Sequence, residues 1–171
     1  SNSSARLNAS WTDGTHTSDT VRKTTDFKVS PNIDTFQLET SPGIYRNWEI
    51  GGDYEFNTQA GNRWKICVIS NALESANTRE RYDVLSETSK EKNLFLDSWS
   101  NTKERIVRGS YTFDLFESQD IEVGAERAQT ILDSKLALGL SGVTGTPSQS
   151  VGGLIPMPVS NANSTVEEMR Y

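Results

Sequence analysis

The chain has 171 residues and a mass of 19.0 kDa, which suits a single domain. Hydrophobic residues make up 34% of it, whereas Ser, Thr and Asn together account for 50 of the 171 residues. The 17 Lys and Arg are outnumbered by 23 Asp and Glu and form no cationic cluster, which argues against nucleic acid as a partner. A single cysteine excludes an internal disulfide, and no apolar run approaches the roughly 20 residues of a transmembrane segment.

The first 25 residues show neither a helical nor a strand period of apolar side chains. Trp11 is the one large apolar group there, with Leu7 and Val21 as weaker companions. Two interpretations are open, a disordered segment or an irregular loop that Trp11 holds against a core formed elsewhere. We expect the irregular loop over residues 1–25, because a tryptophan is costly to leave in water.

Residues 26–138 are expected to form a β-rich core domain, because apolar and polar residues alternate in them as in strands. The strongest predicted strand is 64–70, where apolar residues occupy both faces as in the middle of a sheet. Ser30-Pro31 and Ser41-Pro42-Gly43 predict turns. The polar residues 71–92 predict a long surface excursion with at most a short helix.

One short α-helix is predicted over 125–138, where apolar residues recur at helical spacing before Gly139. Residues 139–171 are expected to form a flexible Gly/Pro/Ser-rich C-terminal tail, since 136–166 contain no charged residue but five Gly and three Pro. The alternative is an arm whose apolar segment 154–159 docks on a neighbouring subunit. The expected fold class is mainly β, a small antiparallel sheet or sandwich with long polar loops and this one helix.

His16 is the one histidine and lies among hydroxyl and carboxyl side chains. A serine nucleophile requires an imidazole base within hydrogen-bond reach and a carboxylate that orients the imidazole, so any Ser-His-Asp site in this chain depends on His16. In an extended segment, His16 and Ser18 project to the same face. Candidate nucleophiles are Ser18 and Ser10, and candidate orienting residues are Asp13, Asp19, Asp26 and Asp34. The competing interpretation is an exposed loop histidine without a catalytic role.

The sequence predicts neither a metal site nor a cofactor, because one His and one Cys lie far apart and no phosphate-binding glycine loop occurs. We predict that Cys67, in the middle of the strand 64–70, is a buried small apolar group. The four tryptophans and five tyrosines suit either a packed core or a sugar-binding platform. We predict the core position for Trp48, Trp64, Tyr45 and Tyr54.

The acidic β-rich body, the uncharged tail and the residues His16, Ser18 and Asp34 resemble the protruding (P) domain of iflavirus capsid proteins, found in picorna-like insect viruses such as deformed wing virus. Thr17 separates the His from the Ser in this sequence. The resemblance implies a small antiparallel sheet with long loops. It also implies an esterase- or lipase-like set with His16 as base, Ser18 as nucleophile and Asp34 as orienting carboxylate.

The same resemblance implies a place on the virion surface, with other capsid subunits as partners. It implies a role in host attachment or virus entry through a host receptor, a glycan or a membrane lipid. A second hypothesis is a carbohydrate-binding or adhesin-type module without catalysis, which predicts two or more tryptophans that are exposed and coplanar and is ruled out if Trp48, Trp64 and Trp99 are all buried. A third is a structural subunit that docks through its C-terminal arm. The geometry around His16 and the exposure of the tryptophans discriminate among these hypotheses.

Overall fold

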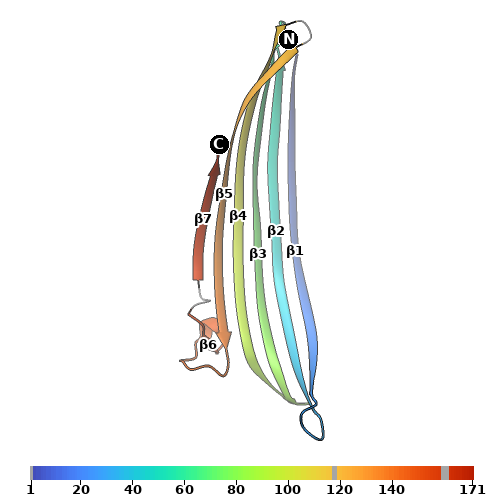
Figure 1. Cartoon of the computed structure of the whole chain (residues 1–171), viewed down its shortest axis with the longest axis vertical. Coiled ribbons are helices and arrows are strands. Elements are labelled where there is room, and N and C mark those ends of the chain that lie inside the picture. Colours follow the sequence, from blue (N-terminus) through green and yellow to red (C-terminus); the bar gives the residue numbers. More distant parts are fainter. Residues whose placement is uncertain (1, 117–118, 159–161) are drawn as a thin grey trace.

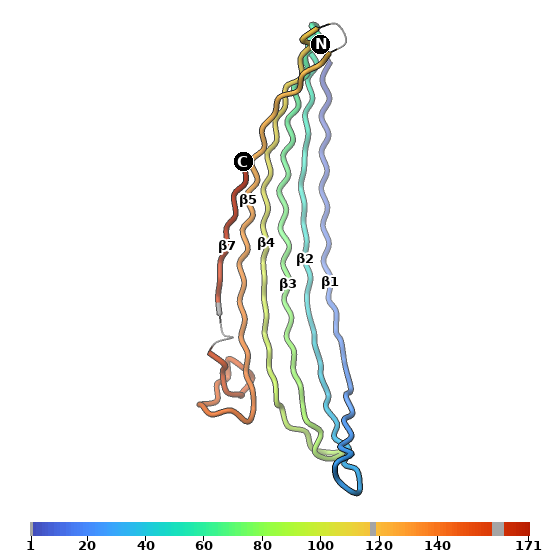
Figure 2. The backbone as a smooth tube through the Cα atoms, in the orientation of Figure 1, coloured from blue at the N-terminus to red at the C-terminus, as the bar shows by residue number. Residues whose placement is uncertain are grey.

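The computed structural model describes residues 2–116, 119–158 and 162–171, and it confirms a mainly β, antiparallel fold of seven strands in one sheet. Five long strands lie side by side in chain order as a single, gently curved layer (Figure 1). Two short strands pair with the outer edge of the fifth (Figure 2). The elements are β1 (Asn2–Asp26), β2 (Ile33–Asn57), β3 (Arg63–Ser86), β4 (Ser89–Phe116), β5 (Gln119–Leu140), the 3-10 turn η1 (Gln149–Val151), β6 (Ile155–Pro156) and β7 (Ala162–Arg170).

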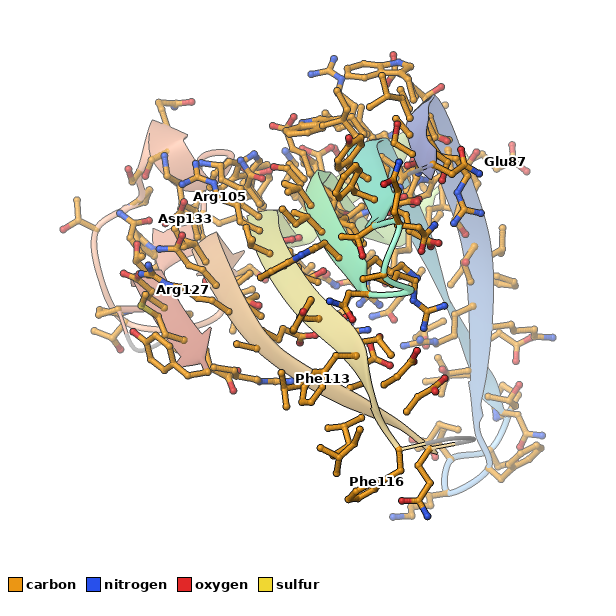
Figure 3. All side chains as sticks on the ribbon, turned by 90° about the horizontal axis from the view of Figure 1, so that it is seen from above. Glu87, Arg105, Phe113, Phe116, Arg127 and Asp133 are labelled. Atoms are coloured by element: carbon orange, nitrogen blue, oxygen red, sulfur yellow. The ribbon has the colours of Figure 1, made fainter. Side chains whose placement is uncertain are left out.

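The two faces of the sheet differ in chemistry. Successive residues of a strand point to opposite faces, and directly paired residues point to the same face. The register therefore places all four tryptophans on one side, which we call the aromatic face: Trp11, Trp48, Trp64 and Trp99. The opposite side, the polar face, carries ion pairs such as Arg6–Asp53 and Arg108–Glu126. Side chains extend from both sides of the single ribbon layer (Figure 3).

Strand β2 continues through Ser41-Pro42-Gly43, where the sequence predicts a turn. Proline has no N–H to donate to a neighbouring strand, and the β2–β3 pairing is interrupted between Thr40 and Gly43. The Asn77 side chain bridges this interruption. Its Nδ2 donates to the Pro42 carbonyl at 3.3 Å, and its Oδ1 accepts from Ser41 Oγ at 3.1 Å. The proline is therefore accommodated in a central strand because a side-chain amide replaces the missing backbone bonds.

The segment after β5 folds back over one end of the aromatic face. Val151 of η1 is the most buried large side chain described, at 1% exposure. The backbone of Gly139 approaches Val151 so closely that a Cβ at position 139 would lie 2.8 Å from the Val151 Cβ. Gly152, at a φ of 65°, lies against the Phe95 ring in the same way. The chain thus covers this end of the sheet with its own residues.

Most of the sheet has no second layer in the described part of the chain. Ala72 and Val151 are its only buried hydrophobic residues. The accessible surface is 12033 Å², whereas a compact monomer of 19.0 kDa exposes about 8,400 Å². The excess arises because both faces of the long strands remain in contact with solvent.

Two segments predicted as irregular are strands. Residues 1–25 were expected to form a loop, but Asn2–Asp26 pairs with β2 along its whole length. Residues 71–92, the expected excursion, form the end of β3 and the start of β4, joined by a tight hairpin at Glu87 and Thr88. Both segments lack apolar alternation because their side chains are largely solvated on both faces. Backbone hydrogen bonds to the neighbouring strand hold both segments in an extended conformation. The pattern of side chains in the sequence does not reveal these bonds.

The predicted helix over 125–138 is also wrong, because these residues belong to β5. Ala128, Leu132 and Leu136 recur every four residues, a spacing that fits one face of a helix and one face of a strand equally well. Pairing with β4 on one side and β7 on the other decides for the strand. Part of the tail 139–171 is also in strands, because β6 and β7 pair with the outer edge of β5. Val159, the end of the predicted docking arm, lies outside the described residues.

We expect Gly139→Ala to destabilise the protein by about 1–3 kcal/mol, because the added Cβ displaces Val151. Urea denaturation measures this loss, and limited proteolysis should show faster cleavage within 141–157. Gly14→Ala is the matched control, since nothing lies within 4 Å of a Cβ at that position in β1. The control should change stability by less than about 0.5 kcal/mol. Equal stability of the two variants would contradict the packing described here.

Candidate functional site

His16 lies on the polar face of β1, directly opposite Gly43 of β2. Its ring occupies the space above this glycine: a Cβ at position 43 would lie 2.4 Å from the His16 Cε1 and 2.6 Å from the Nε2. Glycine is thus required at position 43 by the close approach of the imidazole. His16 itself is exposed, so the interpretation as an exposed histidine holds, although it lies on a strand and not in a loop.

Ser18 lies two residues farther along β1, on the same face as His16, as predicted. It pairs with Ser41, and Ser41 donates a hydrogen bond to Asn77. Cα atoms two residues apart on a strand are separated by about 6.6 Å. The neighbours of His16 on this face of β2 and β3 are therefore hydroxyl and amide groups and the backbone of Gly43.

The structure does not bring Asp34 to His16. Asp34 pairs with Thr25, nine residues beyond His16 along the hairpin, which corresponds to about 30 Å. It also projects to the aromatic face, where Lys23 Nζ lies 2.8 Å from one carboxylate oxygen and Thr25 Oγ1 donates to the other at 2.7 Å. These partners, Lys23 first, hold the pKa of Asp34 below its ordinary value. The carboxylate is thus used in a local ion pair at the far end of the sheet.

The alternative orienting residues do not complete the site either. Asp13 and Asp19 lie at odd positions of β1 and point to the face opposite His16. Asp26 shares the face of His16 but lies ten residues away, at about 33 Å. Ser10, the second candidate nucleophile, is six residues away, at about 20 Å. The predicted Ser-His-Asp set is consequently not assembled, because a long straight strand separates residues that a loop would have brought together.

A different group of side chains gathers halfway along the aromatic face, and we call it the tryptophan band. Trp11 and Trp48 face each other directly across β1 and β2. The next row toward β6 contributes Asp13, Arg46, Glu74 and Asn101 from four neighbouring strands, and the row beyond it contributes Trp99 of β4. The members of the band are Trp11, Asp13, Arg46, Trp48, Glu74, Trp99 and Asn101.

Charged groups connect the tryptophans of the band. Arg46 Nε donates to Asp13 Oδ1 at 3.3 Å, and Arg46 Nη1 lies 3.7 Å from Glu74 Oε2. The indole Nε1 of Trp99 donates to Glu74 Oε1 at 2.8 Å. The ammonium of Lys135 lies 5.2 Å above the Trp99 ring, within cation–π distance. These contacts fix the orientation of Trp99 and Arg46 while the faces of Trp11 and Trp48 stay open.

The band combines exposed rings with an unused polar atom. Trp11 is 66% exposed and Trp48 is 38% exposed, whereas Trp99 is half-buried. Asn101 Oδ1 is shielded from solvent and accepts no hydrogen bond in the described part of the chain. Together with the Asp13 and Glu74 carboxylates and the Arg46 guanidinium, the band offers donors and acceptors beside flat apolar rings.

Predictions that placed aromatic residues in a core are wrong. Trp48, Trp64 and Tyr54 are exposed on the aromatic face, and Tyr45 is exposed on the polar face. Cys67 was predicted to be buried, but it is half-buried on the polar face, paired with Asp53 and Arg108. A sheet without a covering layer cannot bury these side chains. In the described residues, no three His, Cys, Asp or Glu side chains gather as a metal site.

The sequence contains a signal for the band that the analysis above missed. In three strands a tryptophan lies two positions from a polar residue of the band: Trp11 from Asp13, Trp48 from Arg46 and Trp99 from Asn101. Positions two apart share a face of a strand. A strand assignment for these segments would have predicted three tryptophans beside polar groups, but not that Trp11 and Trp48 share a row and that Trp99 lies two rows farther along the same face.

Comparison with known proteins gives no relative: neither a protein family nor a curated protein matches this sequence. In the described ranges, the chain forms no helix with the length and apolarity needed to cross a membrane.

We expect Ser18→Ala and His16→Ala to leave any hydrolysis of p-nitrophenyl esters at the rate of the unmodified chain, because none of the candidate carboxylates in the described ranges lies beside the imidazole. The matched control is Asp34→Asn, which should also leave the rate unchanged. A drop of 100-fold or more in all three variants, the loss expected when a working triad is broken, would restore the catalytic hypothesis.

Proposed function

We propose that this chain is a carbohydrate-binding, adhesin-type module without catalytic activity, and that the tryptophan band is its binding surface. The observation that carries the proposal is the pair Trp11 and Trp48, which lie directly opposite each other with exposed rings on one face. The C–H groups on a pyranose face pack against aromatic rings, and the sugar hydroxyls require donors and acceptors at the ring edge. Asp13, Arg46 and Glu74 supply such groups beside the rings.

The dimensions of the band favour an oligosaccharide. From Trp11 on β1 to Trp99 on β4 the band crosses three strand spacings, about 14 Å. Its surface is open and rigidly supported by paired strands, so a chain of several sugar units can lie across it. The Asp13 and Glu74 carboxylates beside the rings are the acceptors that suit sugar hydroxyl donors.

We expect Trp48→Ala to weaken oligosaccharide binding by about 10-fold or more, because a flat stacking surface is lost from the centre of the band. Titration of the chain with a panel of neutral and acidic oligosaccharides, followed by tryptophan fluorescence and calorimetry, measures the affinity. Tyr45→Ala is the matched control, since Tyr45 lies on the same strand, is 40% exposed and points to the opposite face. Equal losses in the two variants, or no binding of any oligosaccharide in the panel, would contradict the proposal.

We also propose that the module projects from a viral capsid, as the resemblance to iflavirus protruding domains suggests, and functions there in host attachment. The elongated shape supports this setting, since the 25 residues of β1 alone extend over about 80 Å. Antibodies raised against the purified chain should decorate intact particles in immunogold electron microscopy. Labelling that requires disrupted particles would contradict a place on the outer surface.

A further inference from the structure

A second surface lies on the aromatic face, between the tryptophan band and the end of the sheet where β2 turns into β3. We call it the apolar patch. It consists of the residues of four rows that cross β1 to β5, except Arg105, Arg127 and Gln129, which complete two of these rows on β4 and β5 and border the patch; two further residues lie beside the rows. Its members are Ser3, Ala5, Leu7, Ala9, Ile50, Gly52, Tyr54, Phe56, Trp64, Ile66, Val68, Ser70, Val107, Gly109, Tyr111, Phe113, Ile121, Val123 and Ala125.

The apolar patch contains no charged residue, and its largest side chains are open to solvent. Leu7 is 90% exposed, and Trp64, Ile66 and Val68 are each about half exposed. The rings of Trp64 and Tyr111 are tilted against each other at 4.3 Å between centroids, and Tyr111 stacks on Phe113 at 5.5 Å, so the three rings form one aromatic cluster. Contiguous exposed apolar surfaces of this kind mark interaction sites.

The chain covers the other end of this face but not the apolar patch. The segment around Val151 packs on Phe95 and Gly139, close to the end of β5 where β6 pairs. A residue on one face of a sheet occupies about 32 Å², from the strand spacing and the two-residue repeat. The patch therefore measures about 600 Å², and two such patches pressed together would bury about 1,200 Å², the lower bound for stable specific interfaces.

Large and small residues of the patch are arranged so that the surface complements itself. We consider a two-fold axis that runs parallel to β3 between the two sheets. It places β2 of one copy over β4 of the other and keeps each row opposite the same row of the partner. Tyr54 then faces the partner's Gly109, and Val107 faces the partner's Gly52, where the Leu7 side chain lies across the glycine, 2.9 Å from the position of an added Cβ. Arg105 and Arg127 at the border face the partner's Ile50 and Leu7. At Gly109 the nearest atom to an added Cβ is 4.0 Å away, so the surface is hollow there and can admit a ring.

The charges beside the patch limit the contact to the patch. Under the same axis, Glu74 would face the partner's Glu74, and Asp13 would face the partner's Asp133, because these residues share one row. Like charges opposite each other oppose close packing. The strand directions of two sheets packed face to face differ by about 30° within the plane of the layers, so the tryptophan band of each copy still faces the partner's sheet, with Trp48 near the partner's Lys103.

We propose that a second copy of this chain packs on the apolar patch, aromatic face to aromatic face, to form a two-layer sandwich with two-fold symmetry. The band and the patch share no residue, but this packing sets the band of each copy against the partner's sheet, so dimerisation and oligosaccharide binding at the band compete. The buried layer supplies the core that one copy lacks, and the sheets lie about 10 Å apart as in other sandwiches.

The experiment is the oligomeric state of the intact chain, measured by sedimentation and by light scattering during size exclusion from 1 to 100 µM. We expect a dimer, and we expect Val68→Lys to weaken it on the order of 100-fold, since position 68 lies on the axis and each lysine meets the partner's lysine. Leu73→Lys is the matched control on the same strand, where Leu73 is 38% exposed on the polar face. The control should leave the dimer intact.

A cross-link tests the face-to-face arrangement directly. In a Cys67→Ser background, Val68→Cys should give a covalent dimer with a short bismaleimide, and Leu73→Cys should not. A monomer at 100 µM, a dimer that Leu73→Lys dissociates and Val68→Lys does not, or cross-linking only at position 73 would overturn the proposal. A monomer that binds neutral lipid vesicles through the patch would also overturn it. Circular dichroism spectra identical to those of the unmodified chain show that the variants fold.

Discussion

The backbone hydrogen bonds between successive long strands hold this fold together, and every other feature depends on them. A compact domain of this size gains its stability from a buried core, but this sheet buries few side chains in the described residues. Cross-strand pairs supplement the ladder, for example the tilted rings of Trp64 and Tyr111 and the side chain of Asn77 beside Pro42. The strands are long because each added pair of residues extends the ladder without requiring a second layer.

The sequence predicts the parts of this fold in which side chains alternate, and it misses the parts that the backbone alone determines. The strand at 64–70 and the shared face of His16 and Ser18 follow from a period of two. Residues 2–26 show no such pattern, and Leu132 and Leu136 fit a helix as well as a strand. Asp34 was misplaced for a related reason, since its distance from His16 depends on the length of the hairpin and not on the local pattern.

The aromatic face divides along its length into three surfaces of different chemistry. The segment around Val151 occupies one end from within the chain. The tryptophan band in the middle combines open rings with Asp13, Arg46 and Glu74, a chemistry that suits a polyhydroxylated ligand. The uncharged apolar patch at the other end suits a surface like itself. Because β4 contributes Phe95, Trp99 and Val107 to these three surfaces, one continuous strand positions them relative to one another.

The open aromatic face also determines how the protein responds to temperature and denaturant. The heat capacity change and the denaturant slope of unfolding scale with the surface that unfolding exposes. A single layer with 12033 Å² already in contact with water has less surface left to expose than a compact protein of equal length. Its stability curve is therefore flatter, and its unfolding transition in urea is broader. A partner that covers the face would make the stability curve more strongly curved and the urea transition sharper. Binding to this face would therefore increase the cooperativity of unfolding.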